Sequence, residues 1–251
     1  MTVKPRAKQK PAAVCGFHAV TAALHRTPRA VRAVLVDHAR RDRRMAELQQ
    51  AARRAGAELR RVDFAELDAA AGGARHQGVV ALTAAPAARG GRELLCHVAG
   101  LAHAPLVLAL DGVQDPHNLG ACLRTADAAG VDAVVLPAAR ACGLTPAAAR
   151  AASGAAVAVF RVANLPRALR QLKDAGLWVV GAAGDAELSL HDADLGGPLA
   201  LVLGGEARGM RPLVARCCDS TVRIPMRGTV SSLNVSVAAG VALFEVLRRR
   251  G

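Results

Sequence analysis

An asparagine and an arginine follow the apolar segment 106–110, which is typical of a buried strand. The loop 111–117 leads into a helix that Asn118 is expected to cap, and Arg124 lies two turns into that helix. An arginine at such a strand-to-helix junction can bind a phosphate through its planar fork of donors. A helix cap followed by a surface arginine is the structural alternative, and these two residues alone do not decide between the two interpretations.

Two later segments, 199–210 and 224–238, place further polar groups and glycines at the ends of predicted strands. Glycines at strand ends let a ligand approach the backbone closely. In the structural alternative, Glu206 is a solvated loop residue, and Ser232 and Asn234 cap the last helix. The residues concerned are Gly204, Gly205, Glu206, Ser232 and Asn234.

The common nucleotide-binding loops are missing from the sequence. Residues 204–209 lack the spacing of a Gly-x-Gly-x-x-Gly loop, and no Gly-Lys-Ser/Thr phosphate loop occurs. A Rossmann-type methyltransferase, a dehydrogenase and an NTPase are therefore disfavoured.

The pattern Asn118-x-Gly120-x-x-x-Arg124-Thr-Ala resembles the first motif of the SpoU (TrmH-like) branch of the SPOUT RNA methyltransferases. Segments 199–210 and 224–238 are similar to the second and third motifs of that family, in the same order. The resemblance implies S-adenosylmethionine (AdoMet) as the methyl donor and a ribose 2′-hydroxyl as the acceptor. The site residues that it implies are Arg124, Asn118, Glu206, Ser232 and Asn234 for catalysis, and Gly204, Gly205, Ile224, Met226 and Leu233 for cofactor binding.

The family match gives Arg124 two possible roles. As a base it would remove the proton of the 2′-hydroxyl, although a guanidinium group stays charged in proteins. As an electrostatic activator it would bind the adjoining phosphate and favour the developing oxyanion. Both roles stay open.

The formal net charge of +13 favours a polyanionic partner, and most of the charge lies in the N-terminal third. Residues 1–85 carry 16 basic and 7 acidic side chains, residues 86–104 have a net charge of +1, and residues 105–251 have a net charge of +3. Aromatic residues make up only 2% of the chain, so base stacking on an aromatic sheet is disfavoured. The six cysteines have no Cys-x-x-Cys pairing, which predicts free thiols with neither a metal site nor a disulfide.

The N-terminal third divides into two parts. Residues 1–14 are expected to be a mobile basic arm, whereas in residues 15–85 helices at 17–25, 43–55 and 64–71 alternate with strands at 31–37, 59–62 and 78–82. This order predicts a small, mainly parallel α/β sheet. The opening Gly-Phe-His-Ala-Val and the closing Gly-Gly-Ala-Arg-His-Gln-Gly resemble the RNA-binding N-terminal domain of the family, which is related in fold to ribosomal protein L30e. His76 in the closing segment is either part of that signature or a structural turn histidine.

Residues 86–104 resemble a linker that contains a short helix, and residues 105–251 form the predicted methyltransferase domain. Strands are expected at 106–110, 133–136, 157–162, 177–181, 199–204 and 221–224, with helices at 118–129, 146–152, 165–175 and 232–249. This is a parallel α/β pattern. The family resemblance alone implies a trefoil knot and a homodimer, for which 244–247 offers apolar surface.

Taken with the resemblance, the sequence predicts AdoMet-dependent 2′-O-methylation of a guanosine ribose in 23S rRNA. A tRNA 2′-O-methyltransferase of the same branch is the close alternative. A non-catalytic RNA-binding or ribosome-assembly factor is the alternative from another class, although the retained polar residues of all three motifs oppose it. No apolar segment reaches the ~20 residues of a membrane helix, and residues 1–10 lack an apolar signal core, so a cytoplasmic protein is expected.

Overall fold

The computed structural model describes residues 12–26, 28–83, 90–206 and 209–251. The chain divides into two compact units, Met1–Ala87 and Ala88–Gly251. Among the described residues, no helix combines the length and hydrophobicity needed to cross a membrane.

The described part of the N-terminal unit contains a four-stranded sheet in the order β1-β4-β2-β3. β4 is antiparallel to both β1 and β2, and only β2 and β3 are parallel. The predicted mainly parallel sheet is therefore wrong, because β4 returns between β1 and β2 in the opposite direction, and the order of elements along a sequence does not encode strand direction. The elements are β1 (Ala12–Cys15), α1 (Phe17–Arg26), a 3₁₀ turn (Pro28–Ala30), β2 (Val31–Asp37), α2 (Arg43–Arg54), β3 (Glu58–Val62), α3 (Phe64–Ala71) and β4 (Val79–Thr83).

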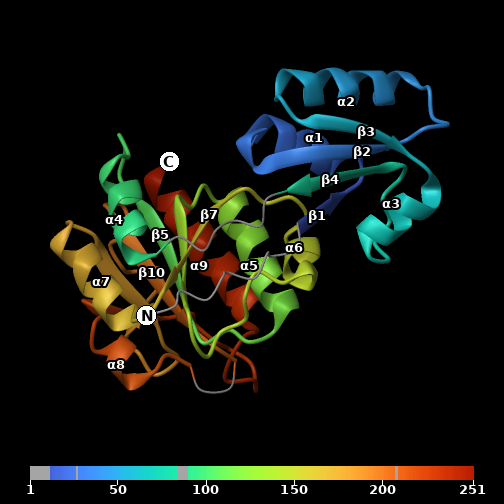
Figure 1. The fold of residues 1–251 in the computed structure, drawn as a ribbon. Coiled ribbons are helices and arrows are strands. Elements are labelled where there is room, and N and C mark those ends of the chain that lie inside the picture. The colour runs from blue at the N-terminus through green and yellow to red at the C-terminus, as the bar shows by residue number, and fades with distance from the viewer. Residues whose placement is uncertain (1–11, 27, 84–89, 207–208) are drawn as a thin grey trace, which may run out of the picture. The chain divides into compact units, whose positions relative to one another are not determined.

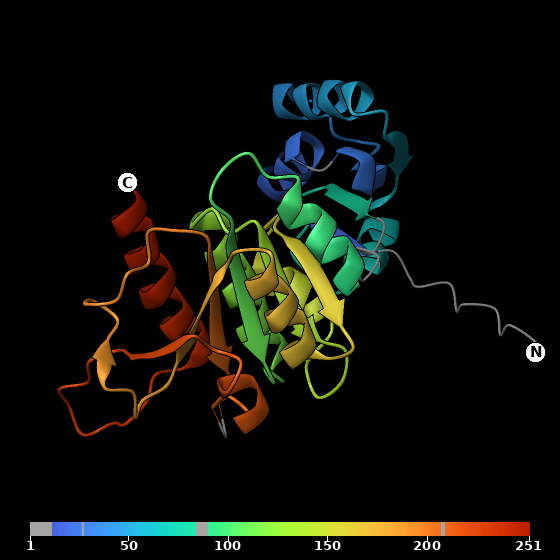
Figure 2. The ribbon, with the colours of Figure 1, turned by 90° about the vertical axis from the view of Figure 1, so that its left-hand side faces the viewer.

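β1 occupies the end of the segment expected to be a basic arm, and residues 1–11 of that segment lie outside the described residues. The sheet carries α1 and α2 on one face and α3 on the other (Figures 1 and 2). Phe17 and Leu48 are buried on the first face and Leu67 on the second. The unit therefore has a small three-layer core.

His76 is a structural residue of the loop before β4. Its ring is buried, its Nδ1 accepts a hydrogen bond from the Gly78 N–H at 3.1 Å, and its Nε2 lies 3.0 Å from Asp68 Oδ1. Phe64 covers the ring at 4.7 Å between centroids. Because both nitrogens are occupied, the structure favours the interpretation of a structural turn histidine.

The described part of the C-terminal unit contains a seven-stranded sheet in the order β7-β6-β5-β10-β8-β11-β9, and every neighbouring pair is parallel. The predicted parallel α/β architecture is correct here. The elements are α4 (Gly91–Ala99), β5 (Leu106–Asp111), α5 (Pro116–Ala128), β6 (Ala133–Pro137), α6 (Pro146–Ala152), β7 (Ala158–Val162), α7 (Leu165–Asp174), β8 (Trp178–Ala182), β9 (Leu188–Ser189), β10 (Leu199–Gly204), α8 (Pro212–Ala215), β11 (Ser220–Arg223) and α9 (Val235–Arg250).

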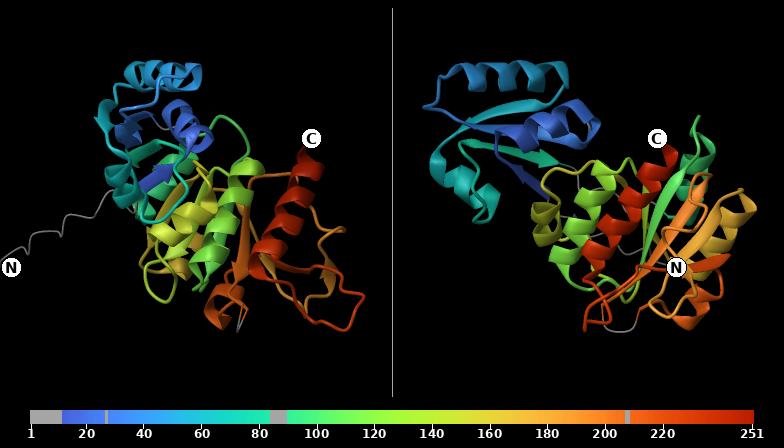
Figure 3. Two further views of the ribbon diagram at one scale, coloured as in Figure 1. Left: turned by 90° about the vertical axis from the view of Figure 1, so that its right-hand side faces the viewer. Right: turned by 180° about the vertical axis from the view of Figure 1, so that it is seen from behind.

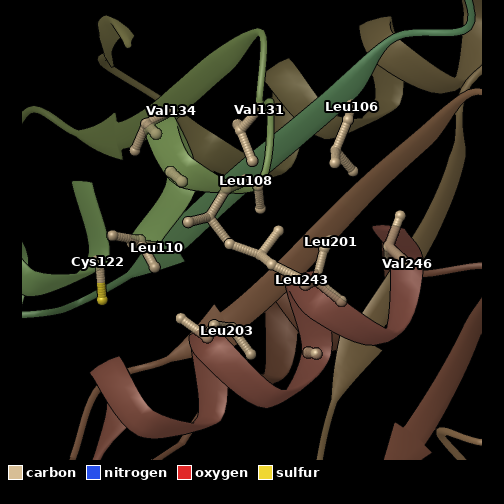
Figure 4. Packing of buried hydrophobic residues seen from close by; sticks show 14 of the residues in the cluster. Leu106, Leu108, Leu110, Cys122, Val131, Val134, Leu201, Leu203, Leu243 and Val246 are labelled. Atoms are coloured by element: carbon tan, nitrogen blue, oxygen red, sulfur yellow. The ribbon is translucent and has the colours of Figure 1, made fainter. Parts of the chain in front are cut away.

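Helices cover both faces of this sheet, which explains why β5, β6 and β10 are continuous apolar runs. α4, α7 and α8 lie on one face, whereas α5, α6 and α9 lie on the other, with α9 beside α5 (Figures 1 and 3). Figure 4 shows Leu243 of α9 close to Leu201 and Leu108, in the hydrophobic cluster between the sheet and the α5, α6 and α9 layer.

α4 belongs to the C-terminal unit rather than to a linker. Leu94 and Val98 are buried in the same cluster as Val107 and Phe160 of the large sheet. Residues 91–99, which the sequence assigns to a linker, therefore complete one face of the C-terminal sheet.

Candidate active site

The three motif segments leave the large sheet at the same edge. Asp111 ends β5 and Gly204 ends β10, and the two residues are direct partners in the parallel register. β11 pairs with β8 on the far side of β10 and leads into Ile224. The carboxyl edge of a parallel sheet is where α/β proteins bind ligands.

Asn118 is not the cap of its helix. α5 begins at Pro116, and the Asp115 side chain caps it by accepting a hydrogen bond from the His117 N–H at 2.9 Å. An aspartate before proline is a strong start signal, because proline pre-sets the first helical residue. The predicted cap at Asn118 is therefore wrong, and its amide is free to bond elsewhere.

The side chain of Asn118 joins the other two motifs. Its Nδ2 donates a hydrogen bond to Glu206 Oε1 at 2.5 Å, and its Oδ1 accepts one from Asn234 Nδ2 at 3.0 Å. These partners lie 88 and 116 residues away in the sequence. The fold thus brings one residue of each motif into a continuous polar network.

Asn234 fixes the direction of this network. Its Oδ1 accepts hydrogen bonds from the Ser236 N–H at 2.8 Å and from Ser236 Oγ at 2.7 Å, which leaves its Nδ2 to point at Asn118. α9 begins at Val235 and Asn234 is its cap, so the predicted helix start at residue 232 is wrong. Capping and site assembly are therefore performed together by one amide.

Arg124 and Ser232 do not join the network within one chain. Both are exposed, and neither side chain has a hydrogen-bond or ion-pair partner among the described residues. Arg124 follows Asn118 by six residues, which places it about 9 Å along α5 and about 120° around its axis. The arginine therefore faces solvent and is available to a charged ligand.

Gly120, the glycine of the first motif, is required by packing. A Cβ atom at this position would lie 2.4 Å from Ala151 Cβ and 2.5 Å from the Ala148 carbonyl oxygen of α6. The glycine lets α5 and α6 approach closely and thereby holds the helix that carries Asn118 and Arg124.

Three of the residues predicted to bind the cofactor, Gly204, Gly205 and Ile224, end or directly follow strands that terminate at this edge. A Cβ atom on Gly204 would lie 1.9 Å from the Gly209 carbonyl carbon, so this glycine is needed by the loop that folds back over it. Gly205 donates to the Asp111 carbonyl oxygen at 2.8 Å, and Ile224 packs partly buried against the core. Leu233 is also partly buried, and Met226 is 36% exposed.

Between residues 225 and 233 the peptide groups make no backbone hydrogen bonds with other described residues. Unpaired backbone donors and acceptors that are open to solvent fit the adenine edge and ribose of AdoMet. The residues present therefore suit this cofactor.

Cysteine and metal chemistry find no support at this edge. Cys122 lies in the core below the network, and burial, together with the charge of Glu206, raises the pKa of its thiol to about 12, so it stays protonated. No disulfide bond joins any of the described cysteines. Within the described ranges, no group of three or more His, Cys, Asp or Glu side chains is arranged to hold a metal ion.

A hollow of about 690 Å³ lies at the opposite edge of the sheet. Trp178, Leu199 and Ser220, which begin β8, β10 and β11, line it together with Lys173 and Asp219. None of the predicted site residues lines this hollow, so we assign the site to the carboxyl edge.

One pair at the site was not predicted. Asp111 is fully buried, and its carboxylate binds the Arg211 side chain through Nε at 2.8 Å and Nη2 at 2.5 Å. The available signal was an acid at the end of an otherwise apolar strand, which is unusual because burial of an unpaired charge is costly.

Comparisons with known proteins identify the family of this chain. Residues 105–244 match the model of the SpoU rRNA Methylase family, and residues 13–88 match the model described as RNA 2′-O ribose methyltransferase substrate binding. A Burkholderia protein named 23S rRNA (guanosine-2′-O-)-methyltransferase RlmB is 54% identical over 238 residues, covering 94% of this chain and 95% of its own. A Ralstonia nicotianae protein of the same name is 50% identical and covers 94% of each chain.

Among solved structures, the SpoU methyltransferase AviRb from Streptomyces viridochromogenes, in complex with AdoMet, has a TM-score of 0.77 and 25% identity. The match covers 94% of this chain and 89% of AviRb. The similarity therefore spans both units.

Proposed function

This chain belongs to the SpoU rRNA methylase family, and on that premise we propose that it methylates the 2′-oxygen of a guanosine ribose in 23S rRNA with AdoMet as donor. The observation that carries the proposal is the network of Asn118, Glu206 and Asn234, which joins all three motifs at one edge of the sheet. The two relatives bearing this activity in their names are similar along nearly the whole chain.

We assign donor binding to the loops after β10 and β11. Gly204, Gly205, Ile224, Met226 and Leu233 would hold the adenosine through backbone groups and apolar contact. When bound, AdoMet supplies an electrophilic methyl group on its sulfonium. Glu206 and Asn234 would orient the donor and the acceptor through their shared contact with Asn118.

Arg124 acts at the acceptor in this proposal. Its exposed guanidinium has no partner among the described residues, so it is free to bind an RNA phosphate in a forked geometry. Positive charge there favours the oxyanion that develops as the 2′-hydroxyl loses its proton. Direct removal of that proton by Arg124 is the other form of the proposal, and Ser232 would help to position the ribose.

The N-terminal unit, for which we propose an L30e-like fold, would capture RNA through its α1 and α2 face. A hollow of about 680 Å³ between these helices is lined by His18, His25, Arg44 and Arg54, with Glu47 as its acidic side chain. α3 on the opposite face has no Lys or Arg and carries Glu66 and Asp68. Phosphates are therefore attracted to the α1 and α2 face and repelled from the α3 face.

Three further features belong to the proposal. α9 exposes the apolar stripe Val237, Val241, Phe244 and Leu247, whose helical spacing and exposures of 37–51% fit a homodimer interface. A trefoil knot would be formed by the segment that leads into α9, in keeping with the family. Action on ribosomal RNA would place the protein in the cytoplasm.

Mapping of 2′-O-methyl groups tests the proposal. Purified protein and labelled AdoMet would be incubated with unmodified 23S rRNA and with unmodified tRNA. We expect one methylated guanosine in 23S rRNA. Methylation of tRNA alone would replace the substrate, whereas binding of RNA with no AdoMet affinity in calorimetry would indicate a non-catalytic factor.

A further inference from the structure

Asp111 holds both ends of the loop that carries Glu206. Its carbonyl oxygen accepts the Gly205 N–H at 2.8 Å, where the loop begins. Its carboxylate Oδ2 accepts the Arg211 N–H at 2.8 Å, where the loop ends. Within the loop the Gly209 N–H donates to the Gly205 carbonyl at 3.0 Å.

The side chain of Asp111 is closed to ligands. The residue is 1% exposed, and its other oxygen, Oδ1, is occupied by Nε and Nη2 of Arg211. Asp111 also ends β5, from which the chain continues to Asn118. One buried residue therefore fixes the starting point of the Asn118 segment and the two ends of the Glu206 loop.

We propose that Asp111 is a positioning residue for methyl transfer, which holds Glu206 in contact with Asn118 by binding Gly205 and Arg211. The inference rests on the proposed function of this site. Catalytic groups act only from a narrow range of positions, and a displacement of about 1 Å can cost about 10²-fold in rate. Asp111 binds the chain at Gly205 and at Arg211, on either side of Glu206, so loss of its contact with Arg211 is expected to displace Glu206.

Asp219 provides a matched control at the other edge of the same sheet. Its Oδ2 accepts the Val179 N–H at 2.8 Å, and its Oδ1 pairs with Lys173 Nζ at 2.6 Å. It thus binds one backbone N–H and one cationic side chain, as Asp111 does, but it lies far from the three motifs along the strands. Asp219→Asn therefore measures the effect of losing equivalent carboxylate contacts away from the proposed active site.

The first test is a double-mutant cycle in the full-length protein. At saturating AdoMet and RNA, we expect Asp111→Asn to lower kcat by about 10- to 100-fold and Asp219→Asn to leave kcat unchanged. In a Glu206→Ala background, Asp111→Asn should have almost no further effect, because the group that it positions is gone. Any of three results would overturn the proposal. The first is an equal loss of kcat in Asp111→Asn and Asp219→Asn, and the second is wild-type kcat in Asp111→Asn. The third is that the effects of Asp111→Asn and Glu206→Ala on kcat are independent.

Arg211→Gln keeps the proposal testable if Asp111→Asn does not fold. The Arg211 side chain is 39% exposed, so its replacement disturbs the core less, and the same loss of kcat is expected. A wild-type kcat in this variant would contradict a positioning role for the contact between Asp111 and Arg211.

Hydrogen exchange separates this inference from the proposed function. The Gly205, Gly209 and Arg211 amides should exchange faster in Asp111→Asn than in the wild type, and Asp219→Asn should leave them unchanged. Unchanged exchange of these amides in Asp111→Asn would refute the proposal that Asp111 holds the loop, even if the enzyme is active. If the wild type transfers no methyl group, the proposed function fails, while the exchange data still decide whether Asp111 holds the loop.

Discussion

The two units differ in how far along the sequence their polar contacts reach. In the N-terminal unit the polar side-chain contacts are local or moderately separated, such as His76 with Asp68 across 8 residues and Arg40 with the Gln77 carbonyl across 37. At the edge of the C-terminal sheet, Asn118 binds Glu206 and Asn234 across 88 and 116 residues. The first unit presents charge on a surface, whereas the second must be folded throughout to assemble its network.

Because of this difference, RNA capture and methyl transfer are expected to fail in different ways. A charged surface loses affinity gradually as charges are removed, because phosphate contacts contribute in a roughly additive way. A converging network loses rate sharply when one member is displaced. Variants in each unit should therefore separate RNA affinity from the rate of methyl transfer.

The largest effect is expected for Arg124→Ala. Turnover should fall by roughly 10²- to 10⁴-fold, as is typical for the loss of an acid–base or oxyanion-stabilising group. Stability and AdoMet affinity should stay near wild type, because Arg124 is exposed and its neighbours Leu123 and Ala126 supply the packing. Single-turnover kinetics at saturating RNA and AdoMet measure the loss.

Two further variants sharpen this result. Arg124→Lys keeps the charge and loses the planar fork, so rescue by lysine would favour simple electrostatics, and no rescue would favour guanidinium geometry or proton transfer. Arg167→Ala removes an exposed arginine of α7 on the other face of the sheet and should leave turnover unchanged. Near wild-type turnover in Arg124→Ala would refute the assignment of the first motif.

The second prediction concerns a fragment of residues 88–251. We expect AdoMet affinity to be retained, while the RNA dissociation constant rises by roughly 10²-fold at about 0.1 M salt and the salt dependence becomes shallower. The fragment starts before α4, because Leu94 and Val98 are part of its core. Filter binding across a salt series checks this, and equal slopes for fragment and full chain would remove RNA capture from the N-terminal unit.

The third prediction locates capture on one face of that unit. Arg44→Glu/Arg54→Glu in the hollow between α1 and α2 should weaken RNA binding roughly tenfold and reduce the salt slope by about 1 to 2, with kcat at saturating RNA unchanged. Arg32→Glu/Arg61→Glu changes the net charge equally at exposed residues that do not line the hollow. Equal losses in both double variants would mean that net charge, rather than this face, determines affinity.

The sequence predicted the regular elements better than their arrangement. The strands at 31–37 and 199–204 and the helices at 64–71 and 146–152 agree with the structure to the residue, because apolar periodicity and the caps Asp63 and Thr145 mark them locally. β1 and β9 were missed because short strands gain their stability from partners. The burial of α4 was missed because a linker and a core helix can have the same composition over nine residues.

The site was predictable as a set of positions but not as contacts. The family resemblance named Asn118, Glu206 and Asn234, and the structure brings them together. The structure does not bring Arg124 or Ser232 to them within one chain, since the direction of a side chain around a helix and the course of residues 224–234 depend on tertiary packing. Asp111 went unnoticed because its partner Arg211 lies 100 residues away.

The smallest effect is expected on the acid stability of the C-terminal unit when Glu245 is replaced. Glu245 of α9 is 8% exposed, and its carboxylate binds Arg248 at 2.6 Å and Arg249 at 3.1 Å. The hydrogen bonds from Arg248 are the main cause that lowers the pKa of Glu245 from 4.5 to about 2. A carboxyl group with a lowered pKa stabilises the fold above its ordinary pKa, and this contribution is lost as the pH falls from about 4.5 towards about 2.

Glu245→Gln should therefore have a lower Tm than the wild type at neutral pH, and the gap should narrow progressively between about pH 4.5 and pH 2. Trp178, the single tryptophan of the chain, lies on β8, so its fluorescence follows the C-terminal unit alone. Asp42 and Glu58 of the N-terminal unit also have pKa values lowered by Arg40 and Arg60, but their protonation is not reported by this probe. Because every other acid titrates equally in both proteins, the difference in Tm reports the contribution of Glu245. A difference that stays constant down to about pH 2 would show that the contacts of Glu245 with Arg248 and Arg249 do not stabilise α9.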